Sequence, residues 1–194
     1  PETDQFRDMC ISAGIQEEVD LRLDWTVKNR ALVDSVKQKA AGRPILLVQP
    51  VRLPMGRRDG FGKELMPNGK AMDYVLQSIR HKFFIVKFGK KGRIEHDPQI
   101  YDLDLLDKTS LSDSIDLATI ADCFLGQCSL IVPLSESFNK KCFLLWSAKG
   151  LRANHIYIRQ ITPEKILHKK HLQSWVFDDW TNEKMDQTIK EFFK

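Results

Sequence analysis

The sequence Gly-Gln-Cys-Ser at 126–129 directly follows a predicted strand and opens a predicted helix. Glycine permits a close backbone approach, and a serine at such a turn can cap the helix. The free N–H groups at a helix start bind anions, most often nucleotide phosphates. An ordinary turn with a capping serine has the same sequence, so both interpretations stay open. A nucleophilic role for Cys128 is disfavoured because no histidine is tied to it in sequence.

The loop after the first predicted strand carries a second set of candidate phosphate ligands. Between residues 50 and 67 it contains Arg52, Arg57 and Arg58. A guanidinium pairs with phosphate oxygens through a planar two-bond fork, so these side chains suit a polyphosphate. The alternative is a flexible basic loop, since long loops are either functional or disordered.

Other motifs with a defined chemistry are missing from the sequence. It contains no G-x-x-x-x-G-K-[ST] or G-x-G-x-x-G phosphate loop, no H-E-x-x-H and no G-x-S-x-G. The four cysteines form no C-x-x-C pair, which disfavours a structural zinc site. Cys123 and Cys142 lie in apolar runs and are predicted to be buried thiols in a reducing compartment.

The composition is that of an ordinary globular domain. With 42% hydrophobic and 29% charged residues, the 194-residue chain is neither disordered nor fibrous as a whole, and it can bury a sizeable core. The net charge of +4 is too small to indicate nucleic acid by itself. No apolar run approaches the ~18 residues of a membrane span and no secretion signal is seen, so we expect a cytoplasmic protein. Because the chain begins with Pro1, we expect a processed protein or a fragment of a longer one.

Short apolar runs alternate with amphipathic segments. The runs suit strands buried on both faces and cover 45–48, 83–86, 123–126, 142–146 and 155–158, with a short strand near 100–106. Helices are predicted within 1–43 (including Trp25, and ended by Gly42), after a cap at Asn68, after a cap at Ser110 or Ser112, over 129–138 and over 182–194. This alternation predicts an α/β fold, Rossmann-like, with a mostly parallel sheet flanked by helices. Ligands of such sheets bind at the carboxyl ends of the strands.

Four consecutive motifs carry a family resemblance. Leu-Asp-Lys-Thr-Ser-Leu at 106–111 is similar to a GKTSL turn, and Ile-Ala-Asp-Cys-Phe-Leu-Gly at 120–126 to a helix ending IAxAD with a following xFIG strand. Residues 127–130 fall on an NDSG motif, and 139–147 resemble a GKPxIxLFG strand. In this order the motifs resemble the C-terminal half of GT-B glycosyltransferases, most of all the lipopolysaccharide heptosyltransferase group. The resemblance covers about 44–147.

The resemblance implies a nucleotide-sugar-binding domain over 44–181. A helical linker from an acceptor domain would occupy 1–43, and a packing helix 182–194. The implied ligands of the donor diphosphate are Arg52, Arg57, Arg58, Gln127, Cys128 and Ser129. Lys87 and Lys90 would lie near the nucleoside, and Lys108, Thr109 and Ser110 in a loop near the donor. No cofactor or metal is implied, because the nucleotide-sugar is a substrate and basic groups stabilise its leaving diphosphate. The catalytic base would come from the acceptor domain, so no catalytic residue is named and the acceptor stays open.

Two other functions stay open. Where the family has NDSG, the chain has Cys128 in place of the acid and Leu130 in place of the glycine, and the family histidine falls on Pro133. These differences favour a non-catalytic Rossmann-like interaction module with a decayed donor pocket. The third choice is a nucleic-acid-directed glycosyltransferase, whose basic residues would have to lie on one face; the modest net charge of +4 ranks it last.

Overall fold

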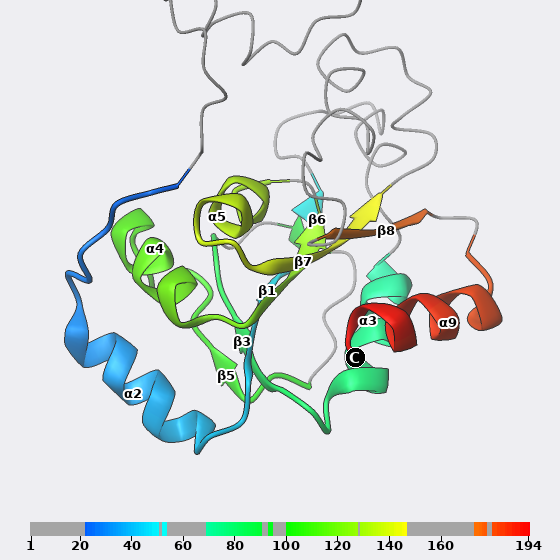
Figure 1. Cartoon of the computed structure of the whole chain (residues 1–194), viewed down its shortest axis with the longest axis horizontal. Helices are drawn as coiled ribbons and strands as arrows, with labels where there is room; N and C mark the ends of the chain where they lie inside the picture. The colour runs from blue at the N-terminus through cyan, green and yellow to red at the C-terminus, as the bar shows by residue number, and fades with distance from the viewer. Residues whose placement is uncertain are drawn as a thin grey trace, which may run out of the picture.

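The centre of the protein is a sheet of parallel strands. The computed structural model describes residues 22–50, 52–53, 69–90, 93–94, 100–127, 129–146, 173–177 and 180–194. The strand order is β5-β3-β1-β6-β7-β8, and every neighbouring pair is parallel (Figure 1). The strands are β1 (Ile45–Gln49), β3 (Phe84–Lys87), β5 (Leu103–Asp104), β6 (Cys123–Gln127), β7 (Lys141–Trp146) and β8 (Gln173–Phe177). The predicted α/β fold with a parallel sheet is therefore confirmed.

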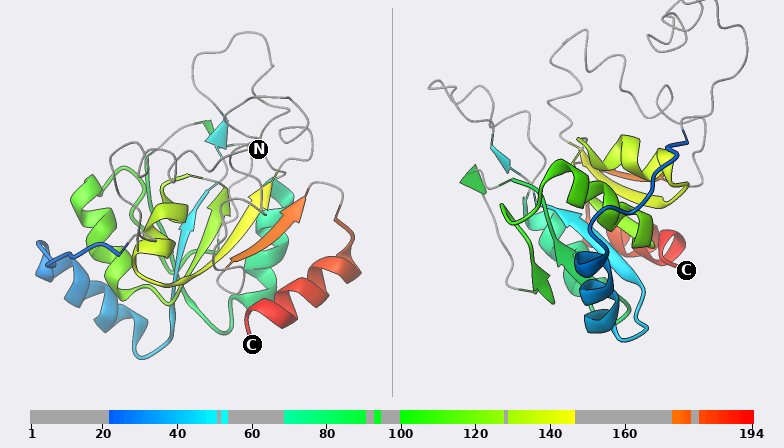
Figure 2. Two further views of the ribbon diagram at one scale, coloured as in Figure 1. Left: turned by 45° about the horizontal axis from the view of Figure 1, so that its top comes forward. Right: turned by 90° about the vertical axis from the view of Figure 1, so that its left-hand side faces the viewer.

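Helices cover both faces of this sheet, so the domain has three layers (Figure 2). One face carries α2 (Arg30–Ala40), α4 (Leu111–Ile120) and α5 (Ile131–Ser137). The other face carries α3 (Gly69–Ile79) and α9 (Asn182–Phe192). Such layering explains the unbroken apolar runs, because a strand covered on both sides needs apolar side chains at every position.

Strand β1 illustrates this two-sided burial. Leu46 and Val48 pack into the core under α3 and α9, whereas Ile45 and Leu47 pack into the core under α2, α4 and α5. All four side chains are buried. The alternation follows from the two-residue repeat of a strand.

Helix α2 is shorter than the sequence predicts. Of the described part of 1–43, only Arg30–Ala40 is helical, so Trp25 lies outside the helix and its predicted place on the helical face is wrong. Asn29 caps the start, with its side chain accepting from the N–H of Leu32. The end is a left-handed turn, with φ of 51° at Ala41 and 83° at Gly42. Glycine takes this conformation without steric cost, which confirms Gly42 as part of the predicted stop.

Some strands of the structure differ from those predicted. The chain has two-residue strands β2 (Arg52–Leu53) and β4 (Arg93–Ile94), which pair antiparallel and were not expected from the sequence. Strand β8 was not expected either. The predicted strand at 155–158 and the predicted cap Asn68 lie outside the described residues.

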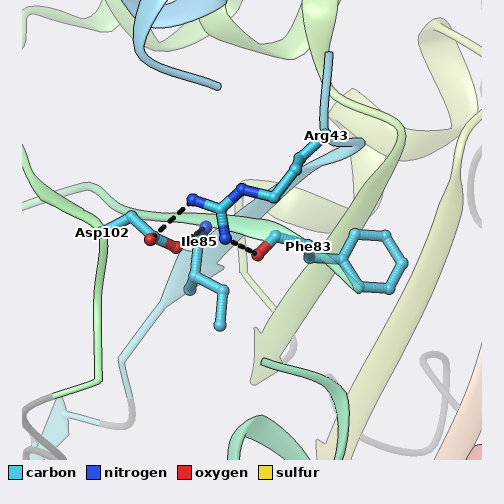
Figure 3. Close-up of polar contacts among 4 residues, drawn as sticks. All are labelled: Arg43, Phe83, Ile85 and Asp102. Carbon is cyan, nitrogen blue, oxygen red and sulfur yellow. Dashed lines mark hydrogen bonds and ion pairs between the residues drawn. The ribbon is translucent and has the colours of Figure 1, made fainter. Parts of the chain in front are cut away.

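Aspartates at the amino ends of the strands extend the sheet's hydrogen bonding. Asp102, just before β5, accepts from the N–H of Ile85 at 2.8 Å and pairs with Arg43 at 2.8 Å; Arg43 also donates to the carbonyl of Phe83 (Figure 3). Asp122, just before β6, accepts from the N–H of Ile45 at 2.7 Å. Each carboxylate satisfies a backbone donor that the neighbouring strand leaves open.

The described residues also bear on the expectations about cysteines, membrane-spanning helices and metal sites. Cys123 and Cys142 are buried thiols outside any disulfide, as predicted, and burial raises the pKa of Cys123 above its ordinary value. Within the described ranges no helix is long and apolar enough to cross a membrane. The same residues contain no cluster of His, Cys, Asp and Glu able to hold a metal ion.

Candidate functional site

The order of the strands reverses direction beside β1, which makes a topological switch point at the carboxyl edge of the sheet. From the central strand β1 the chain moves outward to β3 and β5, then returns to β6 on the other side of β1. Loops on either side of this switch therefore diverge, and ligands of doubly wound sheets bind there. At the switch Gln49, the last residue of β1, stands opposite Gly126 of β6. The strand arrows in the left view of Figure 2 point to this edge.

Gly126 is required by the packing at this switch. A Cβ at position 126 would lie 2.7 Å from the carbonyl oxygen of Gln49 and 3.0 Å from Cδ1 of Ile131. The sequence predicts that glycine permits a close backbone approach. In the structure, the groups that approach Gly126 of β6 closely are those of β1 and α5. No side chain larger than hydrogen fits without displacement of backbone.

Ser129 does not cap helix α5, contrary to the prediction. The helix begins at Ile131, and its N-cap is Leu130, which makes no side-chain capping bond. The Ser129 hydroxyl instead contacts Oε1 of Gln49 and, at 3.0 Å, the carbonyl oxygen of Gln127. A hydroxyl has a single proton and so donates to one of these oxygens at a time. Ser129 therefore links the ends of β1 and β6.

Two buried polar atoms near this edge have no hydrogen-bond partner among the residues that the structure describes. They are Oε1 of Gln127, at the end of β6, and Oγ1 of Thr109, in the turn before α4. Thr109 is only 6% exposed. A buried polar group without a partner costs about 1–3 kcal/mol, so such groups are uncommon without a ligand or water to satisfy them. Both belong to the predicted site.

Ser110 is the N-cap of α4, as predicted. Its hydroxyl accepts from the N–H of Asp113 at 3.0 Å, and the Asp113 carboxylate accepts from the N–H of Ser110 at 2.8 Å. These two bonds form a capping box. The bond from Asn29 and those from Ser110 lower the pKa of Asp113 below its ordinary value. The hydroxyl of Ser110 is thus already used in holding the helix start.

The lysines predicted near the nucleoside differ in their surroundings. The Lys87 side chain is 4% exposed, and its Nζ lies 3.2 Å from Oδ2 of Asp104 and 4.9 Å from the ring centroid of Tyr101. Burial by itself raises the pKa of Asp104, but hydrogen bonds from Leu106 and Lys87 outweigh it and lower the pKa. Lys90 is exposed. The charge of Lys87 is therefore largely balanced inside the protein.

Of the remaining predicted residues, Lys108 and Arg52 lie in loops at the same edge. Lys108 is exposed and donates to the carbonyl oxygen of Asp104 at 2.9 Å. For Arg52 the structure describes the backbone, which pairs with Ile94 and so joins the loops that follow β1 and β3. Arg57, Arg58 and Cys128 lie outside the described residues.

Gln49 is the site residue that the sequence reasoning missed. It is 6% exposed and touches Ser129 at the switch. Its signal in the sequence is a polar residue directly after the apolar run 45–48, where a buried strand reaches the ligand edge of the sheet.

Comparisons with known proteins agree with this architecture. The sequence profile of no known family matches the chain, and no curated protein matches it in sequence. The ADP-heptose LPS heptosyltransferase II of E. coli matches in structure with a TM-score of 0.53 at 12% identity, over 89% of this chain and 52% of that one. The glycosyl transferase family 9 protein of Veillonella parvula matches with a TM-score of 0.56 at 10% identity, over 98% of this chain and 52% of that one.

The chain spans about half the length of both of these structures. At such low identity the likeness establishes the fold, and it agrees with the resemblance seen in the motifs at 106–147. The strand order, the covered faces and these matches together show that the chain has the Rossmann-like fold of one domain of a GT-B glycosyltransferase.

Proposed function

We propose that the protein is the donor-binding half of a glycosyltransferase, which holds a nucleotide-sugar while its sugar passes to an acceptor hydroxyl. The observation that carries this proposal is the pair of unpartnered buried polar atoms, on Gln127 and Thr109, at the carboxyl edge of a doubly wound sheet. Polar ligands bind at that edge in folds of this kind. A bound donor supplies hydrogen-bonding groups that these atoms lack in the free protein.

In this proposal, the residues of the site have different roles. Gln127 and Thr109 contact polar groups of the donor. Gln49, Gly126 and Ser129 fix the positions of the strand ends behind it. Arg52, Arg57 and Arg58 are proposed to pair with the diphosphate, because a guanidinium matches phosphate oxygens with two parallel bonds.

The proposed half binds its donor without turning it over. Transfer needs an acceptor and a base beside it, which we assign to a second domain across the cleft. The leaving diphosphate is stabilised by fixed cations and N–H groups in this scheme.

A non-catalytic interaction module is the second candidate. Leu130 is 38% exposed at the start of α5, where it offers an apolar side chain next to the switch. The Lys87 ammonium is paired with Asp104. The exposed leucine suits a surface for protein contact, and the pairing with Asp104 leaves Lys87 less available to a nucleotide. This alternative predicts that no nucleotide binds.

Thermal unfolding in the presence of ADP-, UDP-, GDP- and CMP-linked sugars tests the proposal. A ligand at about 100 times its dissociation constant stabilises the folded protein by about 2.7 kcal/mol, which raises the melting temperature by several degrees. We expect one nucleotide to do so. Gln127→Met and Arg52→Ala should each reduce the shift.

Gln187→Met is the matched control for Gln127→Met. Gln187 is exposed on α9, in the helical layer on the opposite face of the sheet from α4 and α5. Its replacement by Met is the same chemical change as Gln127→Met. It should leave the shift intact. A folded protein that responds to none of the four nucleotides would overturn the donor-binding proposal in favour of the interaction module.

A further inference from the structure

A second candidate binding site lies at the opposite edge of the sheet, where the strands begin. A cavity of about 290 Å³ opens there, close to the lower end of the usual range of ligand pockets of about 300–1,000 Å³. Its lining residues come from the starts of adjacent strands and from the end of α9: Pro44, Lys82, Phe83, Asp122, Cys123, Lys141, Phe193 and Lys194. Because β3, β1, β6 and β7 are neighbours, these residues form a continuous row.

The charges that line this cavity are unbalanced. Lys82, Lys141 and Lys194 contribute three ammonium groups, against the side-chain carboxylate of Asp122 and the α-carboxylate that Lys194 carries in the 194-residue chain. One oxygen of Asp122 already accepts from the N–H of Ile45 at 2.7 Å. The lining thus carries an excess of positive charge and of hydrogen-bond donors.

Two of these lysines also hold the end of helix α9, but this leaves donors free. Nζ of Lys141 donates to the carbonyl oxygen of Phe192 at 2.9 Å, and Nζ of Lys82 to that of Phe193 at 3.4 Å. An ammonium group has three N–H donors, and each of these bonds uses one. The same bonds neutralise the negative end of the helix dipole, which would otherwise repel an anion.

The wall of the cavity is apolar and partly aromatic. Phe83 and Phe193 are 9% and 7% exposed, and their rings lie edge to face at 5.6 Å. Cys123 beside them is 2% exposed. A cavity lined by both apolar rings and ammonium groups suits a ligand that has a ring at one end and an anionic group at the other.

We propose that this amino-edge cavity binds a small aromatic anion, with an aryl phosphate ester as its best-fitting class. The ring packs against Phe83 and Phe193, and the phosphate oxygens accept from Lys82, Lys141 and Lys194. The site is separate from the carboxyl-edge switch, so it stands whether or not the protein binds a nucleotide-sugar.

Calorimetric titration of the 194-residue chain with phenyl phosphate tests this proposal. Inorganic phosphate has only the anionic group of phenyl phosphate, and phenol has only its ring. Each should bind at least tenfold more weakly than phenyl phosphate. Lys82→Met and Lys194→Met should each weaken phenyl phosphate about fivefold to tenfold, since each removes one charged donor to the phosphate.

Lys140→Met is the matched control, because Lys140 neighbours Lys141 and is not a lining residue. It changes the net charge equally and should leave the affinity within twofold. Equal weakening by all three variants would show general charge attraction and overturn the site, as would the absence of heat with phenyl phosphate. Melting temperatures of the variants establish that each is folded. Gln127→Met should leave this titration unchanged, which separates it from the nucleotide experiment.

Discussion

The glycine at the switch point sets how closely two strands and a helix approach. We predict that Gly126→Ala destabilises the protein by about 1–3 kcal/mol, because its Cβ would stand 2.7 Å from the carbonyl oxygen of Gln49. The neighbour is backbone and cannot rotate away. Urea unfolding measures the change as a lower midpoint with an unchanged slope.

Gly42→Ala is the informative comparison for Gly126→Ala. Position 42 has open space around a new Cβ but a φ of 83°, so its cost is conformational, about 1 kcal/mol. If the clash lies within the protein, adding a nucleotide-sugar should leave unchanged the loss in free energy of unfolding that each variant shows relative to the unmodified protein. If Gly126→Ala were as stable as the unmodified protein, β1 and α5 would have to move apart without cost. The packing at the switch point would then not require glycine.

Removing the unpartnered hydroxyl of Thr109 is predicted to stabilise the protein, whereas the glycine substitutions destabilise it. Thr109→Val keeps the shape of the side chain and removes a buried oxygen that has no partner. We expect the ligand-free protein to gain up to about 1 kcal/mol, because the desolvation cost of that oxygen disappears. Chemical denaturation measures it, and the nucleotide-dependent shift should fall in the same variant.

The adjacent residue provides the contrast for Thr109→Val. Ser110→Ala removes a cap that is bonded to Asp113, so a loss of about 1 kcal/mol is expected. A loss on Thr109→Val as large as that on Ser110→Ala would show that the Thr109 hydroxyl is satisfied in the free protein. It would then no longer point to a ligand.

At the scale of elements, the segment before α2 is held to α4 by two carboxylates, Asp113, which accepts from the side chain of Asn29 at 2.7 Å, and Asp116. Asp116 is fully buried and accepts from Nε1 of Trp25 at 2.7 Å, from the N–H of Asn29 at 2.7 Å and from the N–H of Lys28. Burial by itself raises the pKa of Asp116, but these hydrogen bonds outweigh it and hold the pKa below its ordinary value. In Figure 1 the segment descends beside α4 to the start of α2.

This lowered pKa determines how the stability depends on pH. The contribution of Asp116 is fully present above the unfolded pKa of about 3.9 and is lost as the pH falls through the lower folded value. We predict that Asp116→Asn loses about 2–4 kcal/mol near neutral pH and shows a flatter decline in acid. Unfolding followed from pH 7 to pH 3 measures both.

Asp34→Asn is the control, since Asp34 is exposed on α2, the helix that follows the segment bound by Asp116. It should change the free energy of unfolding by less than about 0.5 kcal/mol. If the acid limb of Asp116→Asn follows that of the unmodified protein, other carboxylates govern acid unfolding and this assignment is wrong.

The elements also show how far sequence reasoning reaches. Runs such as 45–48 and 123–126 predict strands well, because burial on both faces leaves an unbroken apolar signature. The start of α2 is not readable this way, since Trp25 is held by a carboxylate distant in sequence. Ser129 fails as a cap for the same reason: its hydroxyl is engaged by Gln49 from another strand. Long-range polar contacts leave no periodic pattern.

At the scale of the whole molecule, the parallel sheet separates two edges of different chemistry. The carboxyl edge gathers amide and hydroxyl groups around Gln49 and Gln127, and the amino edge gathers ammonium groups around an aromatic wall. The alternation of strands and helices predicts the first edge, because ligand sites of such sheets lie there. It does not predict the second, since Lys82, Lys141 and Lys194 become neighbours only through strand order and the docking of α9.

If both proposed sites exist, their ligands should stabilise the protein additively. The core between the edges is continuous and apolar, and ligands at opposite ends share no contact residue. Free energies of well-separated, independent changes add within about 0.5 kcal/mol. Each ligand at about 100 times its dissociation constant contributes about 2.7 kcal/mol, so both together should contribute about twice that. Denaturant midpoints with each ligand and with both measure the sum. A combined effect no larger than the single one would mean that the two ligands compete for one site, whereas a sum above the additive value would mean that filling one edge tightens the other.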